Sequence, residues 1–118
     1  MSEVLNERKT TKRDFVLFKK TCEELIGLLG MKDWNVCYEH KDLPGNNAEV
    51  FAVVEGRVAT IRLATVLYGR DSVVDCAKHE VAHLLLETLR WIAGCRWCDE
   101  SEVNLEVERI VMILEKVL

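Results

Sequence analysis

His79-Glu80-Val81-Ala82-His83 lies within residues 72–91, a stretch whose apolar residues recur at helical spacing. Ser72 precedes the first of these apolar residues, and Asp75 follows Ser72 by three positions, which is the pattern of a capping box at a helix start. Residues four apart on a helix lie about one turn above each other. The stretch therefore predicts one amphipathic helix with His79 and His83 side by side on one face.

Two imidazoles at this spacing can bind one metal ion. In zinc hydrolases two His nitrogens, a third protein ligand and an open position for water complete a tetrahedral shell. A Glu beside the ligands then acts as general base on that water. The pattern predicts His79 and His83 as ligands of Zn²⁺ and Glu80 as the catalytic base. In the alternative interpretation the two histidines and Glu80 are ordinary residues of a solvated helix face.

The remaining elements follow from hydrophobic periodicity and turn residues. Apolar residues at helical spacing predict a helix before the motif and another after it, and alternating residues predict three strands between the first two helices. The segments with these patterns are residues 14–29 and 99–118 for the helices, and 34–38, 48–54 and 58–63 for the strands. The fold class is therefore α+β, with residues 1–13 as a polar N-terminal arm and residues 14–118 as a single domain.

The third ligand has several candidates. The metzincin pattern needs Gly and His where this chain has Leu86 and Leu89, so that subfamily is excluded. The last two helices are expected to form an antiparallel hairpin. If that hairpin folds near Cys95, it places His83 level with Glu108. Glu108 is therefore ranked first, and the lower-ranked candidates, in order, are Glu102, whose spacing from the motif matches some aminopeptidases, and Glu106, with His40 or a Cys also possible.

The motif, the helix pair and the run from Glu108 to Leu114 resemble the minimal gluzincin-type zincins, small metallopeptidase-like domains often encoded by phages and integrated elements. The chain is also similar to the metallopeptidase domain of the ImmA/IrrE group, although Val111 and Met112 stand where that group has Ala-Asn. The resemblance implies a zincin-like fold, a peptide or protein substrate, and Zn²⁺ held by His79, His83 and Glu108. It also implies that residues 58–63 form the edge strand over the metal cleft, where an extended peptide could pair.

A peptidase also needs a donor to stabilise the tetrahedral oxyanion. The sequence offers four candidates without choosing among them: Tyr38, His40, Arg62 and Tyr68. Two other kinds of function stay open. One is a catalytically inactive, zinc-binding zincin-like module that acts through protein–protein interaction, and the other is a helical-hairpin interaction domain without metal.

Composition limits the other possibilities. The net charge of −4 over 118 residues argues against nucleic-acid binding, and no apolar stretch approaches the roughly 18 residues of a membrane span. The polar N-terminus has no signal-peptide pattern, which favours the cytoplasm. The odd number of cysteines, five, favours free thiols. Cys95 and Cys98 are expected to be a loop feature with a reversible disulfide, or to supply an alternative ligand. The oligomeric state is not indicated.

Overall fold

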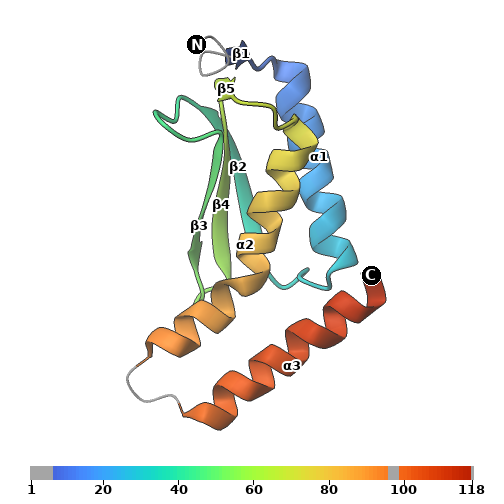
Figure 1. Cartoon of the computed structure of the whole chain (residues 1–118), viewed down its shortest axis with the longest axis vertical. Coiled ribbons are helices and arrows are strands. Elements are labelled where there is room, and N and C mark those ends of the chain that lie inside the picture. The colour runs from blue at the N-terminus through green and yellow to red at the C-terminus, as the bar shows by residue number, and fades with distance from the viewer. Residues whose placement is uncertain (1–6, 96–98, 118) are drawn as a thin grey trace.

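The computed structural model describes residues 7–95 and 99–117, which form a small α+β domain with three helices and two small sheets (Figure 1). This confirms the predicted α+β class, and the zincin-like identity of the fold stays a prediction. In chain order the elements are β1 (Glu7–Lys9), α1 (Lys12–Leu28), β2 (Asn35–Lys41), β3 (Ala48–Val53), β4 (Val58–Ala64), β5 (Val66–Tyr68), α2 (Val73–Gly94) and α3 (Glu100–Val117).

The first two helices begin at capping boxes. Thr11 caps α1 together with Asp14, so α1 begins at Lys12, two residues before the predicted start. At α2 the Ser72 hydroxyl accepts from the Asp75 N–H at 3.0 Å, and the Asp75 carboxylate accepts from the Ser72 N–H at 3.1 Å. These bonds satisfy backbone donors that a helix start otherwise leaves unpaired. The predicted start of the motif helix is therefore confirmed.

The larger sheet has the strand order β2-β4-β3, with β2 parallel and β3 antiparallel to β4. The prediction that residues 58–63 form an edge strand is therefore wrong, because β4 lies between the other two. Burial explains the position: Ile61 and Leu63 of β4 have no exposed surface, as expected of a central strand. The edge beside α2 belongs to β3 instead.

A second, two-stranded sheet was not expected from the sequence. Glu7, Arg8 and Lys9 of β1 pair antiparallel with the three residues of β5. The guanidinium group of Arg8 also donates to the backbone carbonyls of Gly69 and Asp71, just before α2. The part of the predicted polar arm that the structure describes therefore includes a strand, and it is tied to the segment that leads into the motif helix.

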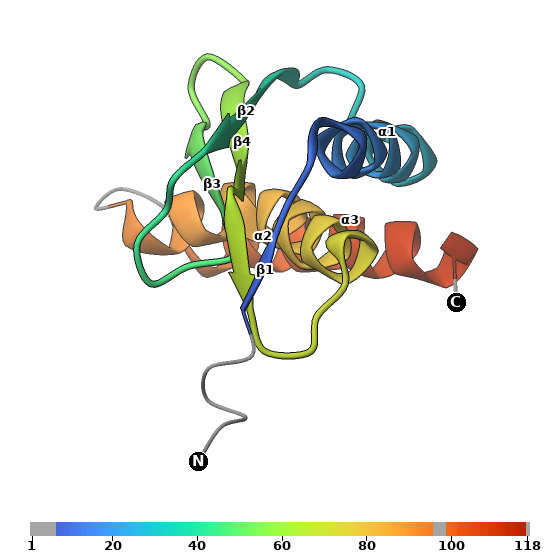
Figure 2. The ribbon, with the colours of Figure 1, turned by 90° about the horizontal axis from the view of Figure 1, so that it is seen from above.

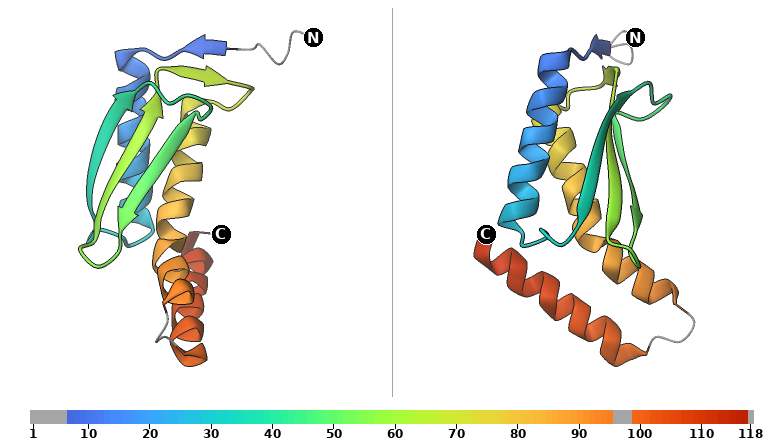
Figure 3. Two further views of the ribbon diagram at one scale, coloured as in Figure 1. Left: turned by 90° about the vertical axis from the view of Figure 1, so that its left-hand side faces the viewer. Right: turned by 180° about the vertical axis from the view of Figure 1, so that it is seen from behind.

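Both α1 and α2 lie on one face of the larger sheet (Figures 2 and 3). Between these layers lies the core, whose largest fully buried side chains are Phe18, Cys22, Ile61, Leu63, Leu67, Val81 and Leu84. The opposite face of the sheet carries Arg62, which forms ion pairs with Glu39 at 2.6 Å and Glu49 at 2.7 Å. The motif helix is thus held by a packed core on one side, which leaves its other side for the candidate site.

The turn between β3 and β4 is fastened to α2 by Arg57. Its guanidinium group donates to the Thr88 hydroxyl at 3.0 Å and lies over the Trp34 ring, 5.4 Å from its centroid. Arg57 also has a backbone φ of 53°, in the left-handed region that few residues other than glycine adopt. These contacts fix the far end of β3 relative to the second half of α2.

After α2 the chain turns back as α3, and the two helices diverge from their shared end (Figures 1 and 3). Glu106 and Ile110 are the buried residues of α3. Among the described residues no helix is both long and apolar enough to cross a membrane.

Candidate metal and catalytic site

His79 and His83 lie one turn apart on α2, with their ring nitrogens facing each other. The two Nε2 atoms are 3.1 Å apart, and the rings meet edge to face with centroids 4.6 Å apart. Zinc–nitrogen bonds of about 2.0–2.1 Å in a tetrahedral shell place two ligand nitrogens about 3.3 Å apart. Both side chains are exposed. The predicted placement of the two histidines on one face of the helix is confirmed. The spacing of their nitrogens is compatible with two adjacent positions around one ion, and their role as ligands stays a prediction.

Glu80 follows His79 directly but is buried, with 6% of its surface exposed. Burial raises the pKa of its carboxyl group, His79 and His83 lower that pKa, and the negative charge of Glu49 raises it. No hydrogen bond among the described residues meets the Glu80 carboxylate. Its acid–base chemistry is therefore set mainly by burial, and the carboxylate is not committed to a structural partner.

A cleft runs between β3 and the histidine face of α2. The hollow at the histidine pair has a volume of ≈ 300 Å³ and is lined by Asn46, Ala48, Glu49, Val50, His79, Glu80, His83, Glu87 and Arg90. A neighbouring hollow of ≈ 200 Å³ shares Asn46, Ala48, His79 and Glu80 with it. Glu80, the candidate base, and both candidate ligands therefore border the same space.

The side of β3 that faces this cleft is a free strand edge. In an antiparallel pair of strands, the backbone N–H and C=O groups of one residue bond to the partner strand, and those of the next residue point away from it. The backbone carbonyl of Asn47 accepts a hydrogen bond from the Ala64 N–H at 2.8 Å. The backbone groups of Glu49 and of every second residue after it therefore bond to β4. The backbone groups of Ala48, Val50 and Ala52 therefore point outward. No strand in the described part of the chain pairs with them.

The structure does not bring a third ligand to the histidine pair. The described residues contain no group of three His, Cys, Asp or Glu side chains that could hold a metal ion. Glu108 is exposed, and at about 100° per residue it lies roughly 200° around α3 from the buried Glu106. Glu102 is also exposed but lies only about 40° from Glu106. No described residue of α3 is among those that line the histidine hollow, so Glu108 as third ligand stays a prediction.

Glu106, the third of these carboxylates, has a structural partner. Both of its oxygens accept from the Arg109 Nε at 3.0 Å, in a pair whose carboxylate is buried and whose Arg109 side chain is 42% exposed. Removing a carboxylate from such a pair would leave Arg109 without its partner. Glu106 is therefore engaged in holding α3, and not in the cleft.

The candidate oxyanion donors lie outside the histidine hollow. His40 bonds to the Thr10 hydroxyl at 2.6 Å and stacks on Phe15, which also removes it as a metal ligand in this arrangement. The Tyr38 ring lies under Lys19, and Arg62 is bound to its two glutamates. Tyr68 borders the next hollow, together with Asn46 and Asn47. Arg62 is linked to the site through Glu49, which lines the cleft.

Several lining residues were missed in the sequence. Glu87 and Arg90 follow His83 at helical spacing on the same face of α2, so extending the periodicity beyond the motif would have found them. They form an ion pair at 3.3 Å. Asn46, Asn47 and Glu49 could not be found this way, because their position depends on how β3 packs beside α2.

The cysteines differ in their surroundings. Burial raises the pKa of the Cys22 thiol to about 12 and that of the Cys76 thiol to about 11. Cys37 is exposed, and the N–H of Cys95 donates to the Ile92 carbonyl at the end of α2. Cys98 lies outside the described residues, so the predicted loop disulfide stays a prediction.

A scan against protein-family models and searches of curated proteins and of solved structures return no match to this chain. The resemblance to zincins therefore depends on the motif and on the order of the elements. The functional proposal therefore depends on the geometry of the site.

Proposed function

We propose that this protein is a zinc-dependent peptidase of the zincin type that cuts extended peptide segments, with Glu80 as general base. The observation that carries the proposal is the facing pair of Nε2 atoms, 3.1 Å apart, next to a buried carboxylate in an open cleft. A hydrolase of this kind needs two neutral ring nitrogens directed at one point and a base beside them.

His79 and His83 would hold the ion, with a third ligand from α3, for which Glu108 ranks ahead of Glu102. Zinc at such a site activates water and polarises a carbonyl group. The ring nitrogens serve this role only when they are unprotonated. A histidine pair on one rigid helix keeps its two nitrogens close together before any ion arrives.

Glu80 would take a proton from the attacking water and pass it to the leaving amine. Its carboxylate borders the same hollow as both histidines. Because burial raises its pKa, the carboxylate holds a proton more readily than an exposed Glu does. Its lack of a bonding partner among the described residues leaves it available for this transfer.

The free edge of β3 would hold the substrate. Outward-pointing N–H and C=O groups of Ala48, Val50 and Ala52 can pair with an extended chain as an added strand. Such pairing uses the peptide backbone, so it tolerates many sequences. This assigns to β3 the role that the resemblance to zincins implied for residues 58–63.

The second candidate is a zinc-binding module that does not cut peptides and acts through protein–protein interaction. It is favoured by the finding that none of the four predicted oxyanion donors lines the histidine hollow. The same free edge would then bind a partner strand without turnover.

Replacing Glu80 with Gln separates the two candidates. The variant should keep about one equivalent of zinc, as the unchanged protein does, but should not cleave an unfolded protein substrate such as reduced casein. If the unchanged protein binds zinc and cleaves nothing, the second candidate, a zinc-binding module that does not cut peptides, is correct. Cleavage by the Glu80→Gln variant at the unchanged rate would contradict the role of Glu80.

A further inference from the structure

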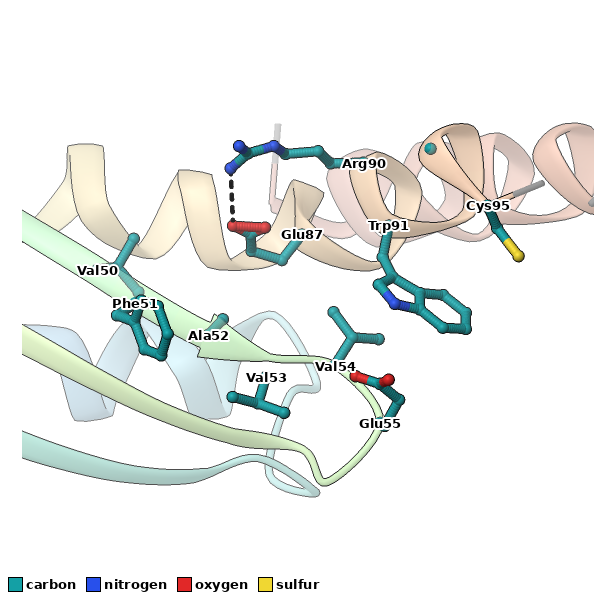
Figure 4. A pocket seen from close by; sticks show the side chains of 11 residues that line it. Val50, Phe51, Ala52, Val53, Val54, Glu55, Glu87, Arg90, Trp91 and Cys95 are labelled. Atoms are coloured by element: carbon teal, nitrogen blue, oxygen red, sulfur yellow. Dashed lines mark hydrogen bonds and ion pairs between the residues drawn. The ribbon is translucent and has the colours of Figure 1, made fainter.

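A larger hollow continues the cleft toward the end of α2 (Figure 4). It has a volume of ≈ 580 Å³ and lies between the second half of β3 and the last turns of α2. Val50, Glu87 and Arg90 line both this hollow and the one at the histidine pair. The two hollows are therefore parts of one groove, bounded by β3 on one side and α2 on the other.

The far end of this groove is lined by apolar side chains and by Glu55. Trp91 lines it from α2 with 44% of its surface exposed, and Val54 lines it from the turn after β3. Figure 4 shows Val50 and Val54 directed toward α2, with the Trp91 ring over the Val54 side of the groove. The Glu87–Arg90 ion pair separates this end from the histidines. A half-exposed indole with an apolar wall opposite it is suited to hold a large apolar side chain.

The backbone of β3 indicates what kind of molecule enters. Val50 and Ala52 line the hollow, and their N–H and C=O groups point to the free edge. A lipid chain or a small apolar molecule would leave these groups without partners, which is costly once water is displaced. An extended peptide can pair with them while its side chains enter the groove.

We propose that the Trp91 end of the groove is a specificity subsite that takes an aromatic or large aliphatic side chain of an extended peptide. Only the expected distance between this subsite and the cut bond rests on the proposed function. Trp91 lies eight residues beyond His83, which is about 12 Å along a helix. An extended peptide covers about 3.3 Å per residue. The selected side chain therefore lies roughly three to four residues from the bond that is cut.

Binding to the Glu80→Gln variant tests the subsite without turnover. The probes are short fluorescein-labelled peptides of Ser, Thr and Lys, either without an apolar residue or with a single central Phe, measured by fluorescence polarisation. The Phe peptide should bind about tenfold more tightly than the peptide without it. Adding Trp91→Ala should remove this difference, and adding Trp91→Phe should keep most of it.

Leu105→Ala is the matched control, because Leu105 is an apolar side chain on α3 that is 72% exposed and does not line the groove. It should leave the preference for Phe unchanged, and circular dichroism should show all variants folded. Equal affinity for the two peptides, or an undiminished preference in Trp91→Ala, would overturn the proposal.

Cleavage mapping separates this proposal from the proposed function. Peptides with Phe at successive positions are incubated with the zinc-loaded, unchanged protein, and the products are identified by mass spectrometry. Cuts at a constant distance of roughly three to four residues from Phe support the subsite. A Phe preference in binding without any cleavage contradicts the enzyme but supports the subsite. Cleavage without regard to Phe supports the enzyme and contradicts the subsite.

Discussion

His79 and His83 meet through their Nε2 atoms, 3.1 Å apart, because a single turn of α2 separates them. The helix that sets this spacing is packed on its other side by Val81 and Leu84, which are almost fully buried. The distance between the two nitrogens is therefore determined by the fold. A bound ion would stabilise the folded state, in which the pair exists, over the unfolded chain, in which it does not.

Zinc should raise the thermal stability of the protein through this pair. At a free zinc concentration of about 100 times Kd, the expected gain in the free energy of unfolding is about 2.7 kcal/mol. His79→Ala and His83→Ala should each lose most of this gain, as measured by the melting temperature with and without zinc. His40→Ala is the control, because His40 bonds to Thr10 away from the cleft. A zinc-dependent shift lost equally in all three variants would contradict the site.

Removing carboxylates from α3 one at a time should identify the third ligand. We expect Glu108→Ala to lose zinc and Glu102→Ala to keep it, because the hairpin inferred from the sequence places Glu108 level with His83. Glu106→Ala should lower the melting temperature without zinc, since Arg109 loses its partner. Metal analysis of each purified variant measures retention. Zinc loss in Glu102→Ala alone would reverse the order inferred from the sequence.

Proline substitutions can test the edge of β3. Val50→Pro removes an N–H that points away from β4, so the sheet should keep its ladder while the cleft loses peptide binding. Phe51→Pro removes an N–H that bonds to β4, and should cost about 1–3 kcal/mol in the free energy of unfolding. Urea unfolding and fluorescence polarisation with the labelled peptides measure the two effects. Undiminished peptide binding by Val50→Pro would exclude β3 as the binding edge.

Stability should decline at alkaline pH through Cys22. Burial raises the pKa of its thiol from the ordinary value of 9.0 to about 12, so the unfolded chain loses this proton at lower pH than the folded one. The contribution of the buried Cys22 thiol to the free energy of unfolding is fully present below pH 9.0, and it is lost as the pH rises toward about 12. Urea unfolding across this range should show a shallower decline for Cys22→Ala. The control Cys37→Ala, at an exposed position, should keep the original slope.

The helices were predictable because their signals are local. Ser72 and Asp75 mark the start of α2 within four consecutive residues, and the apolar periodicity of α1 needs no knowledge of the rest of the chain. The order of the strands has no such signal. Residues 58–63 read as a strand, but their parallel pairing with β2 depends on the path of the chain between them. The three-residue strands β1 and β5 are too short to show a period.

The same division holds for the candidate site. The placement of His79, Glu80 and His83 follows from helical spacing, so the sequence was enough to put them together. A third ligand from α3 depends on how that helix is rotated about its axis and on the angle at which it crosses α2, and the periodicity of the sequence sets neither. The free edge of β3 depends on which residues bond to β4. An alternating pattern does not show whether these are the odd-numbered or the even-numbered residues of the strand.

A peptide that pairs with the free edge of β3 would have to be extended, and Arg57 holds the far end of that strand through Thr88. A folded target cannot pair with this edge until the segment to be cut detaches from its own helix or sheet. For a folded target, the rate of cleavage by the proposed peptidase would then depend on the equilibrium for its local opening, in addition to the side chain that reaches the Trp91 subsite. A protein with such a groove would act as a sensor of conformational stability, removing chains that open often and sparing those that stay closed.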